Sequence, residues 1–300
     1  FSTRTYTVAA CVPRPMPAPS IIAHRGFAGI YPENTLEAVE SATAYPETAM
    51  IEIDVQPAAC GTPIVFHDRR LDGRRDGRPL TLGPTDDGQL VRETSLETLS
   101  RTRVLSTDQH VPTLSSVLEG VPEGVGLNVE LKNPGSTAIR PGELLAEDAL
   151  EEARDRWRPF VERVLEDCHE FGGDLLFSSF CEGALAALRA TTDRYASAPV
   201  VGADLEAGLE IARRYECAAI HPPRNAIAGT DLATESYGKF PGSPDVDLLA
   251  VAHAEGRAVN VWVIETWVQA AQLARAGVDG LIVEYPGLAR RFGGDQRAKR

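Results

Sequence analysis

The sequence predicts an α/β protein, and three observations support this prediction. Short runs rich in β-branched residues alternate with longer stretches of helical pattern, as in a parallel sheet. The 300 residues leave room for a (β/α)8 barrel of about 250 residues as one unit. No internal repeat or linker divides the chain. We therefore expect one barrel domain over 21–290, with an N-terminal extension at 1–20 and a C-terminal tail at 291–300.

Nine segments have the pattern of strands, for the eight places of such a barrel. Only eight residues separate the second segment from the third, too few for the crossover helix that joins parallel strands. One segment is therefore expected to be a hairpin arm or an irregular barrel strand. The segments are 21–24, 50–55, 64–67, 127–132, 175–179, 199–203, 218–221, 259–264 and 280–283.

Helical periodicity follows most of these segments. The first helix begins after Asn34, which with Glu37 resembles a capping box, and Gly277 stands where the last helix should end. Residues 68–126 break the alternation, because Asp-Gly pairs and many charges indicate turns and short hairpins, with short helices at 95–101 and 113–118. We expect an insertion there. The main helices are predicted at 35–43, 144–171, 182–191, 205–215, 246–255 and 266–276.

Composition argues against several classes of protein. A net charge of −13 disfavours a general nucleic-acid binder, whose affinity comes from neutralising phosphates. No uncharged apolar run approaches the ~18 residues of a membrane span, so no integral membrane segment is expected. The five cysteines are far apart and form no CxxC pair, which disfavours a zinc knot or a disulfide framework. Residues 1–20 lack a signal-peptide pattern, so a cytoplasmic location is expected.

Two of the predicted strands place charged side chains inside the barrel. Side chains alternate between the faces of a strand, so Glu52 and Asp54 share one face of 50–55. Asn128, Glu130 and Lys132 likewise share one face of 127–132. The apolar alternate residues belong against the helices, which directs three carboxylates and one lysine into the lumen.

Such a cluster requires compensating charge, because an unpaired buried carboxylate would take up a proton or destabilise the fold. A single lysine does not balance three carboxylates. One divalent cation does, and ligands that are all oxygen atoms indicate Mg²⁺ or Ca²⁺. The alternative is a buried ion-pair network with arginines from elsewhere in the chain.

Two histidines end apolar runs at the points where strands become loops. His24 is followed by Arg25, and His67 by Asp68. In a barrel the carboxyl ends of the strands form the active site, and a histidine pair suits acid–base catalysis near neutral pH. The guanidinium of Arg25 matches a phosphate group. Together with the predicted cation and Lys132, these residues indicate phosphoryl chemistry.

These residues lie in motifs that resemble the glycerophosphodiester phosphodiesterase family. The resemblance extends over about residues 21–287, with the motifs in the family's order. In sequence they are IIAHRG (21–26), YPENTLEA (31–38), IEIDV (51–55), PIVFHD (63–68), VPTLSSVLE (111–119), LNVELK (127–132), LFSSF (176–180), VNVW (259–262) and DGLIVEYP (279–286).

The resemblance implies a TIM-type barrel that hydrolyses small-molecule glycerophosphodiesters to glycerol 3-phosphate and an alcohol, a reaction of lipid and glycerol metabolism. It implies a divalent cation on Glu52, Asp54 and Glu130, and the family's insertion after the HD pair. It also implies that His24 and His67 form the acid–base pair and that Arg25 and Lys132 bind phosphate. Trp262 is either an apolar wall for the glycerol moiety or a core residue.

Three positions depart from the family pattern and leave head-group specificity open. Glu265 stands where the family usually has an asparagine, and Glu284 where it usually has an aspartate. Cys181 replaces a residue that is often aspartate or asparagine. Asn34 is expected to be either a helix cap or a phosphate-site residue, and His221 either a turn residue or part of the barrel mouth.

Two other functions remain open at the level of sequence. One is a phospholipase D or sphingomyelinase D of the same superfamily, although the C-terminal plug motif of that branch is absent from 290–300. The other is a non-catalytic barrel that binds a phosphodiester or a metal as a sensor. The presence of both histidines and all three carboxylates argues against a sensor.

Overall fold

The structure, a computed structural model, describes residues 18–72, 74–75, 78–79, 81–82, 89–242 and 244–288. Nearly all of the predicted N-terminal extension and the whole predicted tail lie outside these residues, so the predicted domain limits stay predictions.

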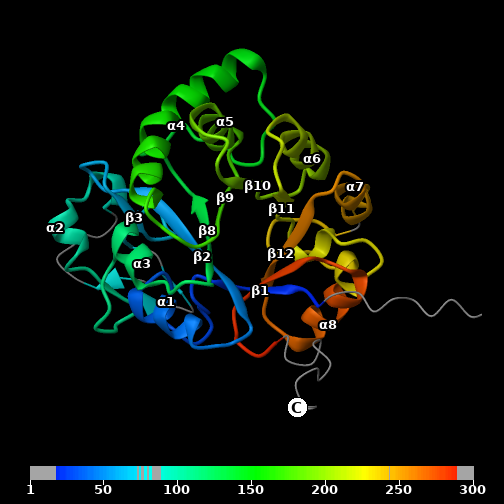
Figure 1. Cartoon of the computed structure of the whole chain (residues 1–300), viewed down its shortest axis with the longest axis horizontal. Helices are drawn as coiled ribbons and strands as arrows, with labels where there is room; N and C mark the ends of the chain where they lie inside the picture. Colours follow the sequence, from blue (N-terminus) through cyan, green and yellow to red (C-terminus); the bar gives the residue numbers. More distant parts are fainter. Residues whose placement is uncertain are drawn as a thin grey trace, which may run out of the picture.

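Eight parallel strands form the barrel, as predicted (Figure 1). Their order is β10-β9-β8-β2-β1-β13-β12-β11. A parallel bridge between Val200 and His221 joins the two ends of this order and brings the barrel close to full closure. The fold is therefore a TIM-type (β/α)8 barrel. The strands are β1 (Ser20–His24), β2 (Thr48–Pro57), β8 (Gly126–Leu131), β9 (Leu175–Ser179), β10 (Ala196–Pro199), β11 (Ala219–Ile220), β12 (Ala258–Ile264) and β13 (Gly280–Val283).

The third predicted segment, 64–67, is the one that is a hairpin arm and not a barrel strand. β3 (Pro63–Val65) pairs antiparallel with the end of β2, which explains the short connection between them. The prediction of a strand at 199–203 is wrong, because β10 pairs with β9 over Ala196–Pro199 and ends there. Val200 and Val201 suggested a strand because they are apolar and β-branched. Both are buried, and Val201 packs beside Gly208 of the following helix.

The helices surround the strands in Figure 1 and cover their apolar faces. Ile51, Ile53 and Val55 of β2 are fully buried in this layer, which confirms the predicted alternation. Among the described residues, none of the helices has the length and apolar content that a membrane crossing requires. The barrel helices are α1 (Leu36–Thr43), α3 (Leu114–Gly120), α4 (Glu147–Cys168), α5 (Glu182–Thr191), α6 (Leu205–Arg214), α7 (Leu248–Ala254) and α8 (Trp267–Ala276).

The helix ends differ in detail from the prediction. The prediction of a capping box formed by Asn34 and Glu37 is wrong. Thr35 is the N-cap of α1, and its side-chain oxygen accepts a hydrogen bond from the backbone nitrogen of Ala38. A capping box does start α8, between Thr266 and Gln269. Gly277 ends α8 with φ +96°, as predicted.

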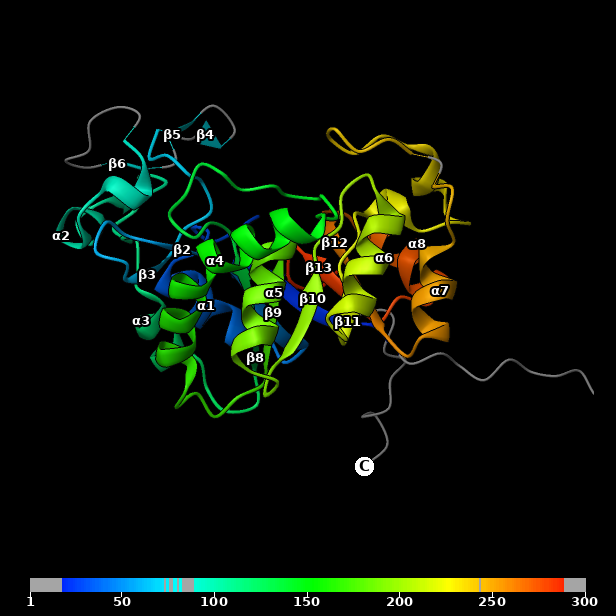
Figure 2. The ribbon, with the colours of Figure 1, turned by 90° about the horizontal axis from the view of Figure 1, so that it is seen from above.

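The segment after β3 leaves the barrel and contains hairpins and short helices, as the sequence indicates. A separate apolar cluster that includes Phe66, Val91 and Leu99 anchors it beside β3. Figure 2 shows this segment and the segment before α7 on the same side of the barrel. The short elements outside the barrel are β4 (Arg74–Arg75), β5 (Arg78–Pro79), β6 (Thr81–Leu82), η1 (Val91–Glu93), α2 (Leu96–Leu99), β7 (Arg103–Val104), η2 (Arg224–Ala226) and η3 (Asp231–Thr234).

Candidate active site

Three carboxylates meet where β2 and β8 lie side by side. The register of these strands pairs Asp54 with Glu130. Glu52 is two residues before Asp54 in β2, so its side chain lies on the same face of the strand. One carboxylate oxygen from each of the three residues lies within 4.8 Å of the others. The predicted acidic cluster is therefore present, and it is formed by the residues the strand alternation selected.

The donor set of this cluster fits a divalent cation. Oε1 of Glu52 is buried and has no hydrogen-bond partner among the described residues. Burial and the neighbouring carboxylates of Asp54 and Glu130 raise the pKa of Glu52 well above its usual value. An uncompensated buried carboxylate oxygen is costly, and a hard cation with oxygen ligands removes that cost. Glu52, Asp54 and Glu130 would hold the ion.

Two basic side chains contact the same carboxylates. Nε of Arg25 lies 3.0 Å from Oδ2 of Asp54, and Nζ of Lys132 lies 2.7 Å from Oε1 of Glu130. Burial raises the pKa of Asp54, but the charges of Arg25 and Lys132 outweigh it and hold that pKa below its usual range. Part of the predicted alternative, an ion-pair network, is thus present. Arg25 also binds Glu33, so its charge is shared and does not neutralise the cluster.

Each predicted catalytic histidine contacts a carboxylate through Nδ1. For His24 the partner is Oε1 of Glu284 at 2.8 Å, and its Nε2 lies 3.8 Å from Oε2 of Glu52. For His67 the partner is Oδ1 of Asp68 at 2.5 Å. Burial, together with the charges of Arg25 and Lys132, lowers the pKa of His67. Among the described residues, no hydrogen bond is found to Nε2 of either ring, so this nitrogen can face a reacting oxygen.

Sequence reasoning gave little weight to three residues that complete this arrangement. Asn34 donates from Nδ2 to Oδ2 of Asp54 at 2.9 Å and accepts from the Asp54 backbone nitrogen at 3.1 Å. It adopts φ +59°, a left-handed conformation that asparagine tolerates. Glu33 binds Arg25, and Glu284 binds His24. The available signal was their position in the segments that follow two barrel strands: Glu33 and Asn34 lie between β1 and α1, and Glu284 comes directly after β13.

Trp262 lies in an aromatic cluster beside the site. Its ring centroid is 5.6 Å from that of Phe180, and Nζ of Lys132 is 5.8 Å from the Phe180 ring centroid. Trp262 also packs against Tyr237 and Phe240. The indole nitrogen donates to the backbone oxygen of His221. Trp262 therefore borders the site through Phe180.

The other doubtful positions have structural partners. His221 is buried in the barrel wall, where its Nε2 accepts from Nδ2 of Asn260, and burial lowers its pKa to about 3. Glu265 pairs with Arg224 at 2.6 Å on the exposed rim. Cys181 is buried at the start of α5.

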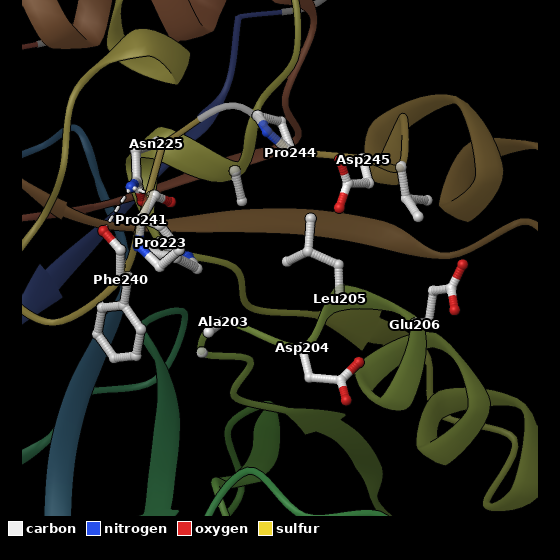
Figure 3. A pocket seen from close by; sticks show the side chains of 14 residues that line it. Ala203, Asp204, Leu205, Glu206, Pro223, Asn225, Phe240, Pro241, Pro244 and Asp245 are labelled. Carbon is white, nitrogen blue, oxygen red and sulfur yellow. Dashed lines mark hydrogen bonds between the residues drawn. The ribbon is translucent and has the colours of Figure 1, made fainter.

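Two cavities open near the carboxyl ends of the strands. One, of about 480 Å³, includes His67, Glu130 and Lys132 in its lining. The other, of about 430 Å³, lies beyond the ends of β10 and β11, with Asp204, Asn225 and Phe240 among its lining residues (Figure 3). None of the eight predicted site residues lines this second cavity, although Phe240 packs on Trp262.

Comparison with known proteins decides the family. The model of the glycerophosphoryl diester phosphodiesterase family matches residues 24–288. The chain belongs to this family. A glycerophosphodiester phosphodiesterase of Bacillus altitudinis is 26% identical over 270 residues, which cover 89% of this chain and 94% of that protein. The Bacillus subtilis protein YhdW is 35% identical over 130 residues, so the matched part spans about half of its length.

Solved structures of this glycerophosphoryl diester phosphodiesterase family share the fold. A phosphodiesterase of Oleispira antarctica, in complex with the product sn-glycerol-3-phosphate, matches with a TM-score of 0.69 at 26% identity, covering 92% of this chain and 96% of that chain. A glycerophosphodiester phosphodiesterase of Thermotoga maritima matches with a TM-score of 0.61 at 21% identity, and the match covers 89% of this chain and 94% of that chain.

Proposed function

We propose that this phosphodiesterase hydrolyses glycerophosphodiesters to glycerol 3-phosphate and an alcohol with one bound divalent cation, Mg²⁺ or Ca²⁺. The observation that supports this most directly is the buried cluster of Glu52, Asp54 and Glu130, which includes a carboxylate oxygen without a hydrogen-bond partner among the described residues. The glycerol 3-phosphate in the Oleispira antarctica relative supports the substrate class. A small-molecule substrate and a cytoplasmic location are parts of this proposal.

Substrate binding relies on charge near the cluster. Arg25 and Lys132 are the basic groups closest to the carboxylates, and each can donate to a phosphate oxygen. When bound, the cation stabilises the negative charge on the phosphoryl oxygens. Trp262 and Phe180 supply an aromatic wall next to Lys132, and we assign Trp262 to the glycerol moiety.

His24 and His67 move the protons. Hydrolysis requires one group to remove a proton from the attacking oxygen and another to protonate the oxygen of the departing alcohol. Glu284 accepts from Nδ1 of His24, so Nε2 of that ring exchanges the proton. Asp68 likewise accepts from Nδ1 of His67, so Nε2 of that ring exchanges the second proton. His24 ends β1 and His67 lies in the loop after β3, so the two rings approach the cluster from different segments.

The test is the release of glycerol 3-phosphate from a panel of glycerophosphodiesters, with and without a chelator. We expect activity that disappears in excess chelator and returns with Mg²⁺ or Ca²⁺. His24→Ala and His67→Ala should each lower kcat by about 10²-fold or more. His253→Ala is the matched control, because His253 is a surface residue that pairs with Asp279. Full activity in chelator, or normal kcat in His67→Ala, would contradict the proposal.

The same assay addresses the two alternatives from the sequence. Cleavage of intact lipids in preference to water-soluble diesters would favour the phospholipase D or sphingomyelinase D type of activity. Saturable binding of a diester without release of any product would favour a sensor.

A further inference from the structure

One connection of the barrel borders the cavity at the proposed reaction centre. We call it the wall segment: residues 133–146, which join β8 to α4. Ile139 and Pro141 of this segment line a cavity of about 480 Å³. His67, which we assign to proton transfer, and Lys132, which we assign to phosphate binding, line the same cavity. A substrate held by these groups therefore lies next to the wall segment.

Packing alone holds the middle of the wall segment weakly. A second space, of about 190 Å³, lies between the segment and the helices α4 and α5, with Trp157 and Gly183 in its lining. Ile139 lines both spaces, so it has open volume on two sides. Backbone with few packed neighbours opens easily unless hydrogen bonds hold it. The position of the wall segment therefore depends on where its hydrogen bonds go.

A buried carboxylate holds the end of the wall segment. Glu182 lies in the first turn of α5 and is buried. Its Oε2 accepts a hydrogen bond from the backbone nitrogen of Leu145 at 2.5 Å. Its Oε1 accepts from Nη1 of Arg214 at 2.7 Å and from the hydroxyl of Tyr215 at 3.0 Å. Both oxygens of Glu182 are therefore engaged by groups of the protein.

Arg214 completes this anchor. Its Nη1 also donates to the backbone oxygen of Leu145, at 3.4 Å. The N–H and the C=O of Leu145 are thus both bonded to the ion pair of Glu182 and Arg214. Hydrogen bonds to ionised groups are stronger than those between neutral groups. Because Glu182 belongs to α5 and Arg214 to α6, the anchor ties the wall segment to two helices of the barrel.

The sheet holds the residues that precede the wall segment. The backbone nitrogen of Lys132 donates to the backbone oxygen of Val55 in β2 at 3.0 Å, so Lys132 follows the sheet. Further along, the backbone nitrogen of Gly142 donates to the backbone oxygen of Phe180 at 2.7 Å, which places the segment against the end of β9. Release of Leu145 would therefore move the wall segment and leave Lys132 in place.

We propose that Glu182 is a positioning residue for substrate binding, because it fixes the wall segment beside the reaction centre. The proposal rests on the proposed function, since it concerns the substrate of the same centre. Glu182 bonds to Leu145, Arg214 and Tyr215, and it takes no part in proton transfer or cation binding. Its loss should therefore weaken substrate binding and leave the chemical step nearly unchanged.

Glu182→Gln tests the anchor with almost no change of shape. Both carboxylate oxygens accept hydrogen bonds, so an amide must turn its NH2 group toward a donor on one side. We expect hydrogen exchange of the Leu145 amide to become faster by about tenfold or more, because a hydrogen bond to a charged group is lost. We also expect KM for a glycerophosphodiester to rise about fivefold and kcat to stay within about twofold of wild type.

Hydrogen-exchange mass spectrometry on peptides from 133–146 and steady-state kinetics measure these effects. Arg214→Gln is the second variant, because Arg214 is exposed enough for the protein to fold without it. It removes the bond to the Leu145 oxygen and should change exchange and KM in the same direction.

Two controls separate the anchor from general stability. Glu255→Gln removes the partner of Arg213, the residue next to Arg214 in α6, at a point that does not contact the wall segment. Val164→Ala removes two methyl groups from the buried face of α4 and should lower the Tm. Both controls should leave the exchange of Leu145 and the KM as in wild type.

The outcomes distinguish this inference from the proposed function. If wild type cleaves no glycerophosphodiester, the proposed function is wrong and the inference falls with it. If wild type is active and exchange becomes faster without a change in KM, the wall segment does not position the substrate and only the inference is wrong. Unchanged exchange in a folded Glu182→Gln and in Arg214→Gln would also overturn it, as would an equal rise of KM in Val164→Ala.

Discussion

Oε1 of Glu284 lies 2.8 Å from Nδ1 of His24, although the two residues are 260 positions apart in the chain. The contact follows from the register of β1 with β13, which pairs Ala23 with Val283 and so brings the next residue of each strand together. A carboxylate at Nδ1 fixes both the tautomer and the orientation of an imidazole. Glu284 therefore directs Nε2 of His24 toward the acidic cluster.

Replacement of Glu284 should affect kcat more than KM. In Glu284→Gln the amide retains a hydrogen bond but loses the charge that stabilises a protonated ring, so we expect kcat to fall by about 10- to 10²-fold. Glu284→Asp should restore part of the loss. Steady-state kinetics on one glycerophosphodiester gives both constants. Glu265→Gln is the control, since Glu265 pairs with Arg224 on the rim. Equal kcat values for Glu284→Gln and wild type would exclude this role.

Asn34 should contribute to cation affinity through Asp54. Both amide atoms of Asn34 bond to Asp54, so its loss frees a proposed ligand to rotate. Removal of such supporting contacts weakens metal binding by about 10- to 100-fold. Asn34→Gly is the preferred variant, because glycine accepts φ +59° and Asn34→Ala adds backbone strain. Calorimetric titration with Mg²⁺ and Ca²⁺ measures the affinity, and unchanged affinity in Asn34→Gly would contradict the prediction.

Divalent cations should stabilise the folded protein. A ligand present at 100 times its Kd contributes about 2.7 kcal/mol to the free energy of unfolding. We therefore expect Mg²⁺ or Ca²⁺ to raise the Tm of wild type. Glu52→Gln should melt higher than wild type in chelator, because it removes a buried charge, and should gain little from the cation. Thermal melts with chelator or with cation measure this. If the cation raised the Tm of wild type and of Glu52→Gln by the same amount, the stabilising ion would bind elsewhere.

His221 should make the protein less stable in mild acid. Its pKa is lowered to about 3 in the folded protein, against about 6.5 in an unfolded chain. Between these values the unfolded chain binds a proton that the folded protein does not, so the free energy of unfolding falls as pH falls, by up to about 1.4 kcal/mol per pH unit. Above pH 6.5 this effect is absent.

Urea unfolding at several pH values between 4 and 7 checks the His221 prediction. His221→Gln keeps a side chain that can accept from Asn260 but does not titrate. The difference in stability between wild type and this variant should change with pH in that window. His253→Gln, at an exposed histidine, serves as the comparison. A constant difference would show that His221 does not titrate as described.

The sequence by itself determined the composition of the acidic cluster. Alternation with a period of two is a local property of a strand, so Glu52, Asp54 and Glu130 had to share the face opposite their apolar neighbours. The order of the elements and the family motifs likewise determined the barrel. The same local rules predicted one exception, a hairpin arm or an irregular strand, because too few residues separate the second segment from the third for a crossover helix; the structure shows that it is the hairpin arm β3.

The tertiary structure decided which residues meet across the barrel. The register of β1 with β13 brings Glu284 to His24. The local sequence left Asn34 as either a helix cap or a phosphate-site residue. The structure gives the cap to Thr35 and bonds both amide atoms of Asn34 to Asp54, a contact between distant strands that local sequence does not encode. The position of β10 was also decided by its ladder with β9, since the apolar Val200 and Val201 pack against the neighbouring layer after the strand has ended. Contacts between distant segments depend on register and closure, which no local pattern encodes.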